Sequence, residues 1–83
     1  MEIRFSDHAR RQMEERGLSE DMIVRTIRDT NGVTRQKENR YRACAFVRIG
    51  GKKFLLVVVY DMPTITTKEI VTAFLTTKFK KYS

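Results

Sequence analysis

Two apolar stretches meet at Gly50-Gly51, and this junction constrains the fold more than any other feature of the sequence. Residues 40–49 alternate between two sets of side chains, and residues 52–61 are apolar in both sets at their centre. A Gly-Gly pair between two such runs is typical of a two-residue β-hairpin turn. We therefore predict antiparallel strands over these two ranges, with Ile49 opposite Lys52 and the second strand central in its sheet.

This register divides the hairpin side chains between two faces. The first face is wholly apolar, so we expect helices to cover it; it contains the pairs Val47–Phe54, Ala45–Leu56, Ala43–Val58 and Tyr41–Tyr60. The second face is apolar in the middle and basic at its edges; it contains the pairs Arg48–Lys53, Phe46–Leu55, Cys44–Val57, Arg42–Val59 and Arg40–Asp61. Two like charges opposite one another are destabilising unless an anion lies beside them. The second face is therefore interpreted as an anion-binding surface, the alternatives being solvated arginines or a cover formed by the C-terminal tail.

Sequence signals on either side of the hairpin complete a single domain over residues 1–83. Ser6 and Ser19 are good helix N-caps, which predicts one helix over residues 7–16, closed by Gly17, and a second that ends at Asn31-Gly32. Further strands are expected over residues 2–5, from Val33 onward, and over 69–76, with a break at 61–64 and a basic tail of undetermined form at 79–83. The order β-α-α-β-β-β-β predicts an α+β fold, with two N-terminal helices packed on a twisted antiparallel sheet.

The chain has a net charge of +7, and its basic residues are concentrated in its later part. Residues 1–32 contain six basic and seven acidic residues, whereas residues 33–83 contain eleven basic and three acidic ones. Such asymmetry indicates a polyanionic partner, with nucleic acid favoured over an acidic protein. A basic surface that serves only solubility is the remaining alternative.

Composition also argues against several classes of function. Cys44 and His8 are the only residues of their types, so we expect no disulfide, no metal site and no cofactor. The longest apolar run, residues 54–60, is much shorter than the ~18 residues that cross a bilayer, so no membrane partner is expected. The first six residues lack the apolar segment of a secretion signal, and the expected location is the cytoplasm.

Two stretches resemble a known family. The first is Phe5-Ser6-Asp7-His8-Ala9, which leads to Glu15-Arg16-Gly17-Leu18-Ser19; the second is Ile70-Val71-Thr72-Ala73-Phe74, followed by Thr76-Thr77-Lys78-Phe79-Lys80-Lys81-Tyr82. Together they resemble a family of small bacterial and archaeal proteins with an "HA…RG(I/L)S" start and a "VTA…K(K)Y" end, grouped with the RelE/ParE toxin superfamily. The resemblance implies a RelE/ParE-like fold. It also implies either metal-independent cleavage of messenger RNA, often on the ribosome, or inhibition of DNA gyrase, and an acidic antitoxin as partner.

Three residues are the candidates for catalysis. RNA cleavage without a metal needs a base for the attacking 2′-hydroxyl and cations beside the phosphate. His8 is the side chain that exchanges a proton near neutral pH, and its match to the resembled family's motif favours a catalytic role over capping or packing. Arg42 is the candidate for stabilising the transition state. Thr72 matches the family's threonine and could hydrogen-bond a phosphate, although its β-propensity alone would explain it.

A second group of residues is predicted to bind the nucleic acid. It comprises Arg40, Phe46, Arg48, Lys53, Lys78, Lys80, Lys81 and Tyr82. Arg40 could instead form an ion pair with Asp61, Phe46 and Tyr82 could stack on bases or hold the tail in place, and the remainder could be solvated. Arg16 is expected to satisfy carbonyls at the end of its helix, and Cys44 to be a small buried hydrophobe.

The sequence therefore predicts a metal-independent endoribonuclease that is the toxin of a toxin–antitoxin pair. Its expected partners are RNA, in solution or on the ribosome, and an acidic antitoxin. The alternative is a non-catalytic module that binds nucleic acid or protein, such as a gyrase-directed inhibitor of the ParE kind. A single histidine and the lack of clustered acids favour this alternative. The sequence does not fix the oligomeric state.

Overall fold

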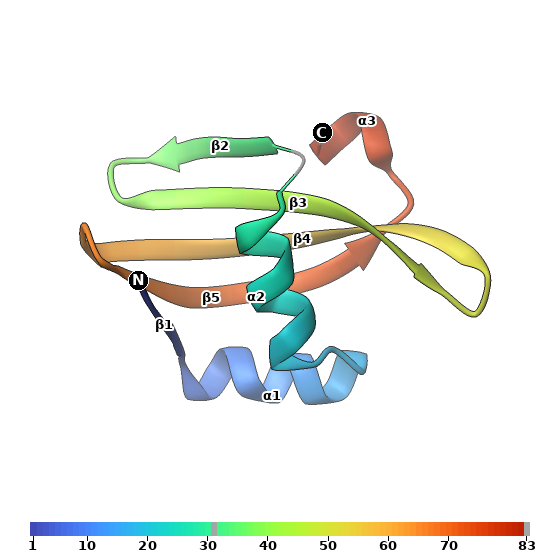
Figure 1. The fold of residues 1–83 in the computed structure, drawn as a ribbon, viewed down its shortest axis with the longest axis horizontal. Coiled ribbons are helices and arrows are strands. Elements are labelled where there is room, and N and C mark those ends of the chain that lie inside the picture. The colour runs from blue at the N-terminus through green and yellow to red at the C-terminus, as the bar shows by residue number, and fades with distance from the viewer. Residues whose placement is uncertain (31, 83) are drawn as a thin grey trace.

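A computed structural model describes residues 1–30 and 32–82, and it has the predicted α+β architecture with one additional short helix (Figure 1). The elements follow in the order β1 (Glu2–Phe5), α1 (Asp7–Arg16), α2 (Glu20–Arg28), β2 (Gly32–Lys37), β3 (Arg40–Ile49), β4 (Lys52–Thr64), β5 (Thr67–Thr76) and α3 (Phe79–Tyr82). The strand order in the sheet is β1-β5-β4-β3-β2, so β4 is central as predicted. No helix among the described residues is long and apolar enough to span a bilayer.

The β3–β4 hairpin has the predicted register along its whole length, from Ile49 opposite Lys52 to Arg40 opposite Asp61. Gly50 and Gly51 have φ angles of 59° and 79°. Positive φ at both central residues is the conformation that twisted two-residue hairpins require, and glycine adopts it without a steric cost. The turn therefore determines which side chains share a face.

The sequence predicted an antiparallel sheet, but one pair of strands in it is parallel. β1 pairs with β5 in parallel, with Glu2 opposite Thr67 and Phe5 opposite Ile70. A parallel pair needs a long connection between its strands, and the helices and β2–β4 provide it here. The expectation failed because nothing local in four residues determines the direction in which a distant strand will pair.

Several element boundaries also differ from the prediction, and β5 begins at Thr67 rather than at residue 69. β4 continues through the expected break to Thr64, with irregular pairing to β5 between Asp61 and Thr64 that accommodates Pro63. α2 ends at Arg28 and is capped by Asp29, while Gly32 already begins β2. Asn31, which was expected to end α2, lies outside the described residues.

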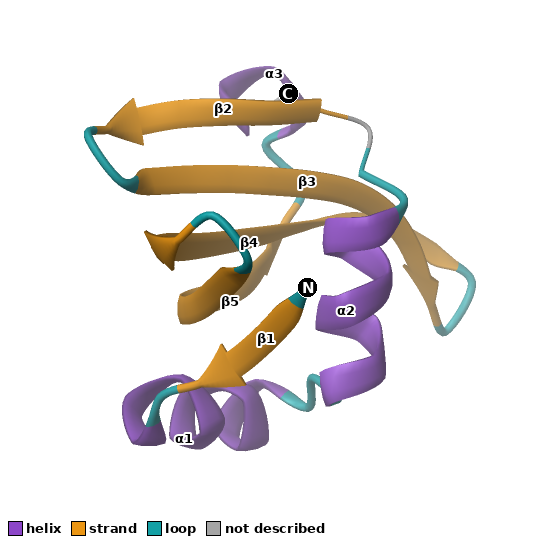
Figure 2. Ribbon diagram, turned by 60° about the vertical axis from the view of Figure 1, so that its left-hand side comes forward, coloured by secondary structure: helices purple, strands orange, loops and turns teal. Residues whose placement is uncertain are grey.

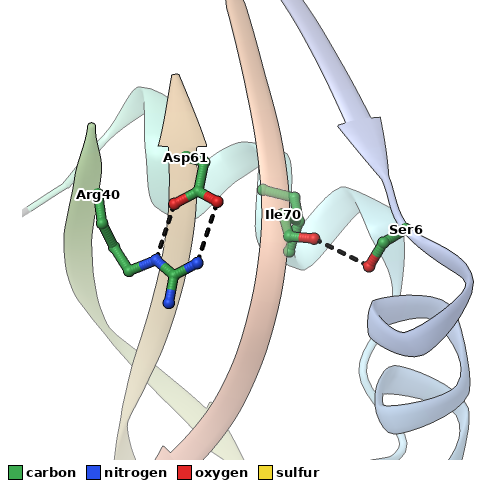
Figure 3. Close-up of polar contacts among 4 residues, drawn as sticks. All are labelled: Ser6, Arg40, Asp61 and Ile70. Carbon is green, nitrogen blue, oxygen red and sulfur yellow. Dashed lines mark hydrogen bonds and ion pairs between the residues drawn. The ribbon is translucent and has the colours of Figure 1, made fainter. Parts of the chain in front are cut away.

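Both N-terminal helices begin at the predicted serine caps. The Ser6 hydroxyl accepts a hydrogen bond from the Ala9 N–H at 3.0 Å and donates one to the Ile70 carbonyl at 3.2 Å (Figure 3). It thereby joins the start of α1 to β5. Among the described residues, the Ser19 hydroxyl accepts from the Met22 N–H alone, at 3.2 Å. Gly17 has a φ of 68° and closes α1 in the left-handed conformation.

The two N-terminal helices cover the apolar hairpin face, as the register predicted. The main core contains Ala9, Met13, Leu18, Ile23, Ala43, Leu56, Val58, Tyr60, Ile70 and Ala73. Leu56 and Val58 of β4 are fully buried, and Ile23 of α2 packs in the same cluster. This packing leaves the opposite side of the sheet, which we call the outer face, to carry the polar and basic side chains.

The middle of the outer face is not open, because α3 packs on it. Cys44, Leu55 and Val57 form a second core with Phe79 and Tyr82 of α3, and with Phe74 of β5. Figure 2 shows α2 and α3 on opposite sides of the sheet. The prediction of an open basic surface is therefore wrong at the centre of this face, where the apolar pairs Cys44–Val57 and Phe46–Leu55 pack against the partly buried rings of the tail.

Candidate nucleic-acid interface

Side chains of the outer face lie in rows that cross the sheet, because paired residues of neighbouring strands point to the same side. One row, which we call the charged row, crosses all five strands and consists of Lys37, Arg40, Asp61, Glu69 and Arg4. The next row, the arginine row, consists of Thr34, Arg42, Val59 and Thr72. The rows lie two residues apart on β3, which is about 6.6 Å. Beyond the arginine row lies the patch covered by α3.

Arg42 is half-buried at the boundary between the arginine row and α3. Its guanidinium carbon lies 5.3 Å from the centre of the Tyr82 ring. Its Nε is buried and has no hydrogen-bond partner among the described residues. A charged donor that is withdrawn from water without an acceptor is costly, and an anion lying beside it would remove that cost. Arg42 Nε is therefore a buried donor that an added acceptor could satisfy.

Thr72 lies in the same row as Arg42, on the other side of Val59. Each of the two pairs with Val59, so their Cα atoms are about 10 Å apart, or two strand spacings. The Thr72 hydroxyl donates to Oε1 of Gln12 in α1, and the Arg16 guanidinium lies 3.5 Å from the same hydroxyl oxygen. The structure thus brings a hydroxyl, an amide and a second guanidinium together at this end of the row.

Arg16 does not end its own helix in the predicted way. Its Nη1 donates to the carbonyl of Ala73 in β5 at 2.6 Å, where β1 has already stopped pairing with that strand. It therefore satisfies the exposed edge of the sheet and holds α1 alongside β5. Sequence reasoning missed both this contact and Gln12. The four-residue spacing of His8, Gln12 and Arg16 gave a signal, since such residues share one helix stripe.

His8 lies in the first turn of α1 and is exposed. It is one helical turn, about 6 Å, before Gln12 on the same stripe. No hydrogen bond or ion pair joins its imidazole to another residue within the described ranges. His8 is therefore on the side of α1 that meets Thr72, whereas Arg42 lies across the row, so the three candidate catalytic residues are not in mutual contact.

Arg40 forms the ion pair with Asp61 that its position suggested. Its Nε and Nη2 donate to the two carboxylate oxygens of Asp61 at 2.7 and 3.0 Å (Figure 3). The hydrogen bonds and charge of Asp61 raise the pKa of Arg40, and those of Arg40 lower the pKa of Asp61. Both side chains are about one-third exposed, so the pair remains at the surface of the charged row.

The predicted binding residues of the hairpin tip lie together at the other end of the outer face. Arg48 and Lys53 are cross-strand partners, and both are exposed. The Lys53 ammonium lies 4.2 Å from the centre of the Phe46 ring, and the edge of Phe79 approaches that ring with centroids 5.6 Å apart. Phe46 keeps 42% of its surface exposed. The tip is thus a basic arm on which one aromatic ring is partly accessible.

The tail residues divide between anchoring and exposure. The Tyr82 ring meets Phe74 edge-on with centroids 5.4 Å apart, and the Tyr82 carbonyl accepts a hydrogen bond from the Cys44 thiol at 3.1 Å. Burial raises the pKa of the Cys44 thiol, and nearby Arg42 opposes that shift. Cys44 is buried, as predicted. Three lysines of this segment are exposed: Lys78, Lys80 and Lys81.

Comparison with known proteins finds a family and no individual relative. The model of the family described as "Domain of unknown function (DUF4258)" matches residues 5–75. The matched range includes His8, Arg16, Arg42 and Thr72, and it ends before α3. No curated protein and no solved structure matches the chain.

Proposed function

This chain belongs to the DUF4258 family, and we propose that it is a metal-independent endoribonuclease of the RelE/ParE-like kind. It acts in the cytoplasm as the toxin of a toxin–antitoxin pair. The observation that carries this proposal is Arg42, whose buried Nε has no partner in the described structure and whose row also contains the Thr72 hydroxyl. This arrangement supports binding of a phosphate between two arginines and a hydroxyl.

The cleavage step uses a nucleophile that the RNA itself provides. The 2′-oxygen forms a bond to the adjacent phosphorus while the bond from phosphorus to the 5′-oxygen breaks. His8 takes the proton of the 2′-hydroxyl, and the leaving 5′-oxygen takes a proton from water. Arg42 and Arg16 balance the charge on the phosphate oxygens, and the Thr72 hydroxyl exchanges its hydrogen bond to Gln12 for one to a phosphate oxygen. The products are a 2′,3′-cyclic phosphate and a 5′-hydroxyl.

The positions of the basic residues support a path for the RNA across the outer face. α3 covers the centre, so the strand approaches over the arginine and charged rows. The exposed lysines of α3 and the hairpin tip hold the flanking phosphates as distributed positive charge. The same charge attracts the acidic antitoxin, which blocks the RNA by occupying this surface.

The test is incubation of the purified protein with RNA in excess chelator, followed by analysis of the product ends. We expect products ending in 2′,3′-cyclic phosphate, and no cleavage at a position carrying a 2′-deoxynucleotide. His8→Ala and Arg42→Ala should each lower the rate by about 100-fold or more. Arg11→Ala, which removes an exposed arginine of α1, is the matched control and should cleave normally. Cleavage that survives both substitutions would show that the assigned roles are wrong.

A non-catalytic binding module is the second candidate, because no contact joins His8 to Arg42 in the described structure. Such a module would bind RNA or DNA gyrase and leave RNA intact. Inducible expression in a bacterium separates the two functions. Growth arrest with fragmented messenger RNA supports the ribonuclease, whereas arrest with intact messenger RNA and inhibited gyrase supports the module.

A further inference from the structure

Four members of the charged row line a hollow at one end of the outer face: Lys37, Arg40, Asp61 and Glu69. The hollow has a volume of about 360 Å³ and borders the arginine row. It combines hydrogen-bond donors, acceptors and one apolar ring in its lining, which includes Lys37, Asn39, Arg40, Asp61, Pro63 and Glu69. No step of the proposed cleavage uses this hollow.

Arg40 and Asp61 form the floor of the hollow, and they satisfy each other's charge and hydrogen-bonding groups. Their two parallel hydrogen bonds hold the guanidinium and the carboxylate edge to edge across β3 and β4 (Figure 3). Both carboxylate oxygens of Asp61 accept from Arg40, so the pair leaves its planar surface for stacking rather than for a new ion pair. Proteins that bind single-stranded RNA stack bases on arginine planes of this kind.

Lys37 and Glu69 stand on the two sides of this floor. They are the row's members on β2 and β5, so their Cα atoms are separated by three strand spacings, about 14 Å. Neither belongs to an ion pair among the described residues. The hollow therefore offers a cation with three donors on one side and a carboxylate that only accepts on the other.

We propose that this hollow binds a guanine base of the RNA. Guanine presents two acceptors, O6 and N7, and a neighbouring amino donor, whereas no other base combines these groups. The base stacks on the Arg40–Asp61 pair, Glu69 accepts from its N–H groups, and Lys37 donates to O6 or N7. The inference rests on the proposed function, because the arginine row, about 6.6 Å away along β3, holds the phosphate of the same nucleotide.

The test compares the binding of four mononucleotides, namely 3′-GMP, 3′-AMP, 3′-CMP and 3′-UMP, by calorimetry. We expect the Kd for 3′-GMP to be at least about fivefold below the other three, since one well-formed base contact discriminates by that much or more. Amide NMR signals of the β2–β3 turn should shift with 3′-GMP. Equal affinity for all four nucleotides overturns the inference, and so does binding that shifts only signals elsewhere.

Glu69→Gln and Glu14→Gln form a matched pair, because each removes one negative charge and Glu14 lies on the exposed side of α1. Glu69→Gln should weaken 3′-GMP binding at least about fivefold, whereas Glu14→Gln should leave it unchanged. If the loss of a carboxylate merely strengthened binding of the anion, both variants would bind 3′-GMP more tightly, and the inference would fall. RNA cleavage without a preference for guanine would refute guanine binding in the hollow and leave the ribonuclease proposal standing. Selective binding of 3′-GMP without RNA cleavage would refute the ribonuclease proposal and leave guanine binding standing.

Discussion

At the scale of single residues, the outer face contains two arginines of the same strand in opposite situations. Arg40 donates to both carboxylate oxygens of Asp61, whereas Arg42 has an Nε without a partner in the described structure. Alternation placed both on one face, and the turn register paired Arg40 with Asp61, so the sequence predicted that ion pair. It did not predict the Tyr82 ring over Arg42, because that contact depends on how the tail folds back.

The Arg40–Asp61 pair gives stability a defined pH dependence. The folded pKa of Asp61 lies below its unfolded value, so the contribution of the pair is complete above about pH 4 and is lost as pH falls through the folded pKa. We expect Asp61→Asn to lower the urea midpoint at pH 6. The difference in urea midpoint between this variant and the parent protein should become smaller between pH 4 and pH 2. Urea unfolding at stepped pH measures this.

The matched control for this prediction is Glu15→Gln, which neutralises an exposed carboxylate of α1. The difference in urea midpoint between Glu15→Gln and the parent protein should not become smaller in the same way. A constant gap for Asp61→Asn across the acid range would mean that the ion pair does not stabilise the fold.

At the scale of elements, α1 is fixed to β5 at both of its ends. Ser6 bonds the carbonyl of Ile70, the last β5 residue that pairs with β1, and Arg16 bonds the carbonyl of Ala73, which lies beyond that pairing. An uncovered strand edge invites pairing with other chains, so α1 also protects this side of the sheet. This docking is what brings Gln12 and Arg16 to Thr72, and it makes the site depend on the helix.

The two serine caps allow this docking to be tested. Ser19→Ala removes one cap bond and should cost about 1 kcal/mol in the free energy of unfolding. Ser6→Ala removes a cap bond and the donor to Ile70 as well, so we expect a loss of about 2 kcal/mol. Chemical denaturation of both variants measures the difference. Equal losses would indicate that the Ser6–Ile70 bond contributes nothing to stability.

At the scale of the whole molecule, the sequence predicted what short-range rules determine. A Gly-Gly turn sets the register of twenty residues, and serine and glycine caps set both helix starts and the end of α1. The parallel β1–β5 pair, the irregular stretch near Pro63 and the docking of α3 are contacts between distant segments. For that reason alternation could place Arg42 on the outer face, and the family resemblance pointed to Thr72, but neither could show that Gln12 and Arg16 contact Thr72 or that the hollow forms.

The proposed function requires that RNA reach the arginine row and not merely the basic hairpin tip. The most direct measurement is the NMR spectrum of arginine Nε–H groups in the 15N-labelled protein, during titration with a 2′-O-methyl RNA that cannot be cleaved. Arg42→Lys assigns the Arg42 signal, and exposed Arg28 of α2 provides a reference away from the outer face. We expect the Arg42 Nε–H signal to shift as its vacant donor meets a phosphate, while the Arg28 signal stays in place. If the Arg48 signal shifts until the protein is saturated with RNA while the Arg42 signal does not move, RNA does not reach the arginine row and the proposed function is contradicted.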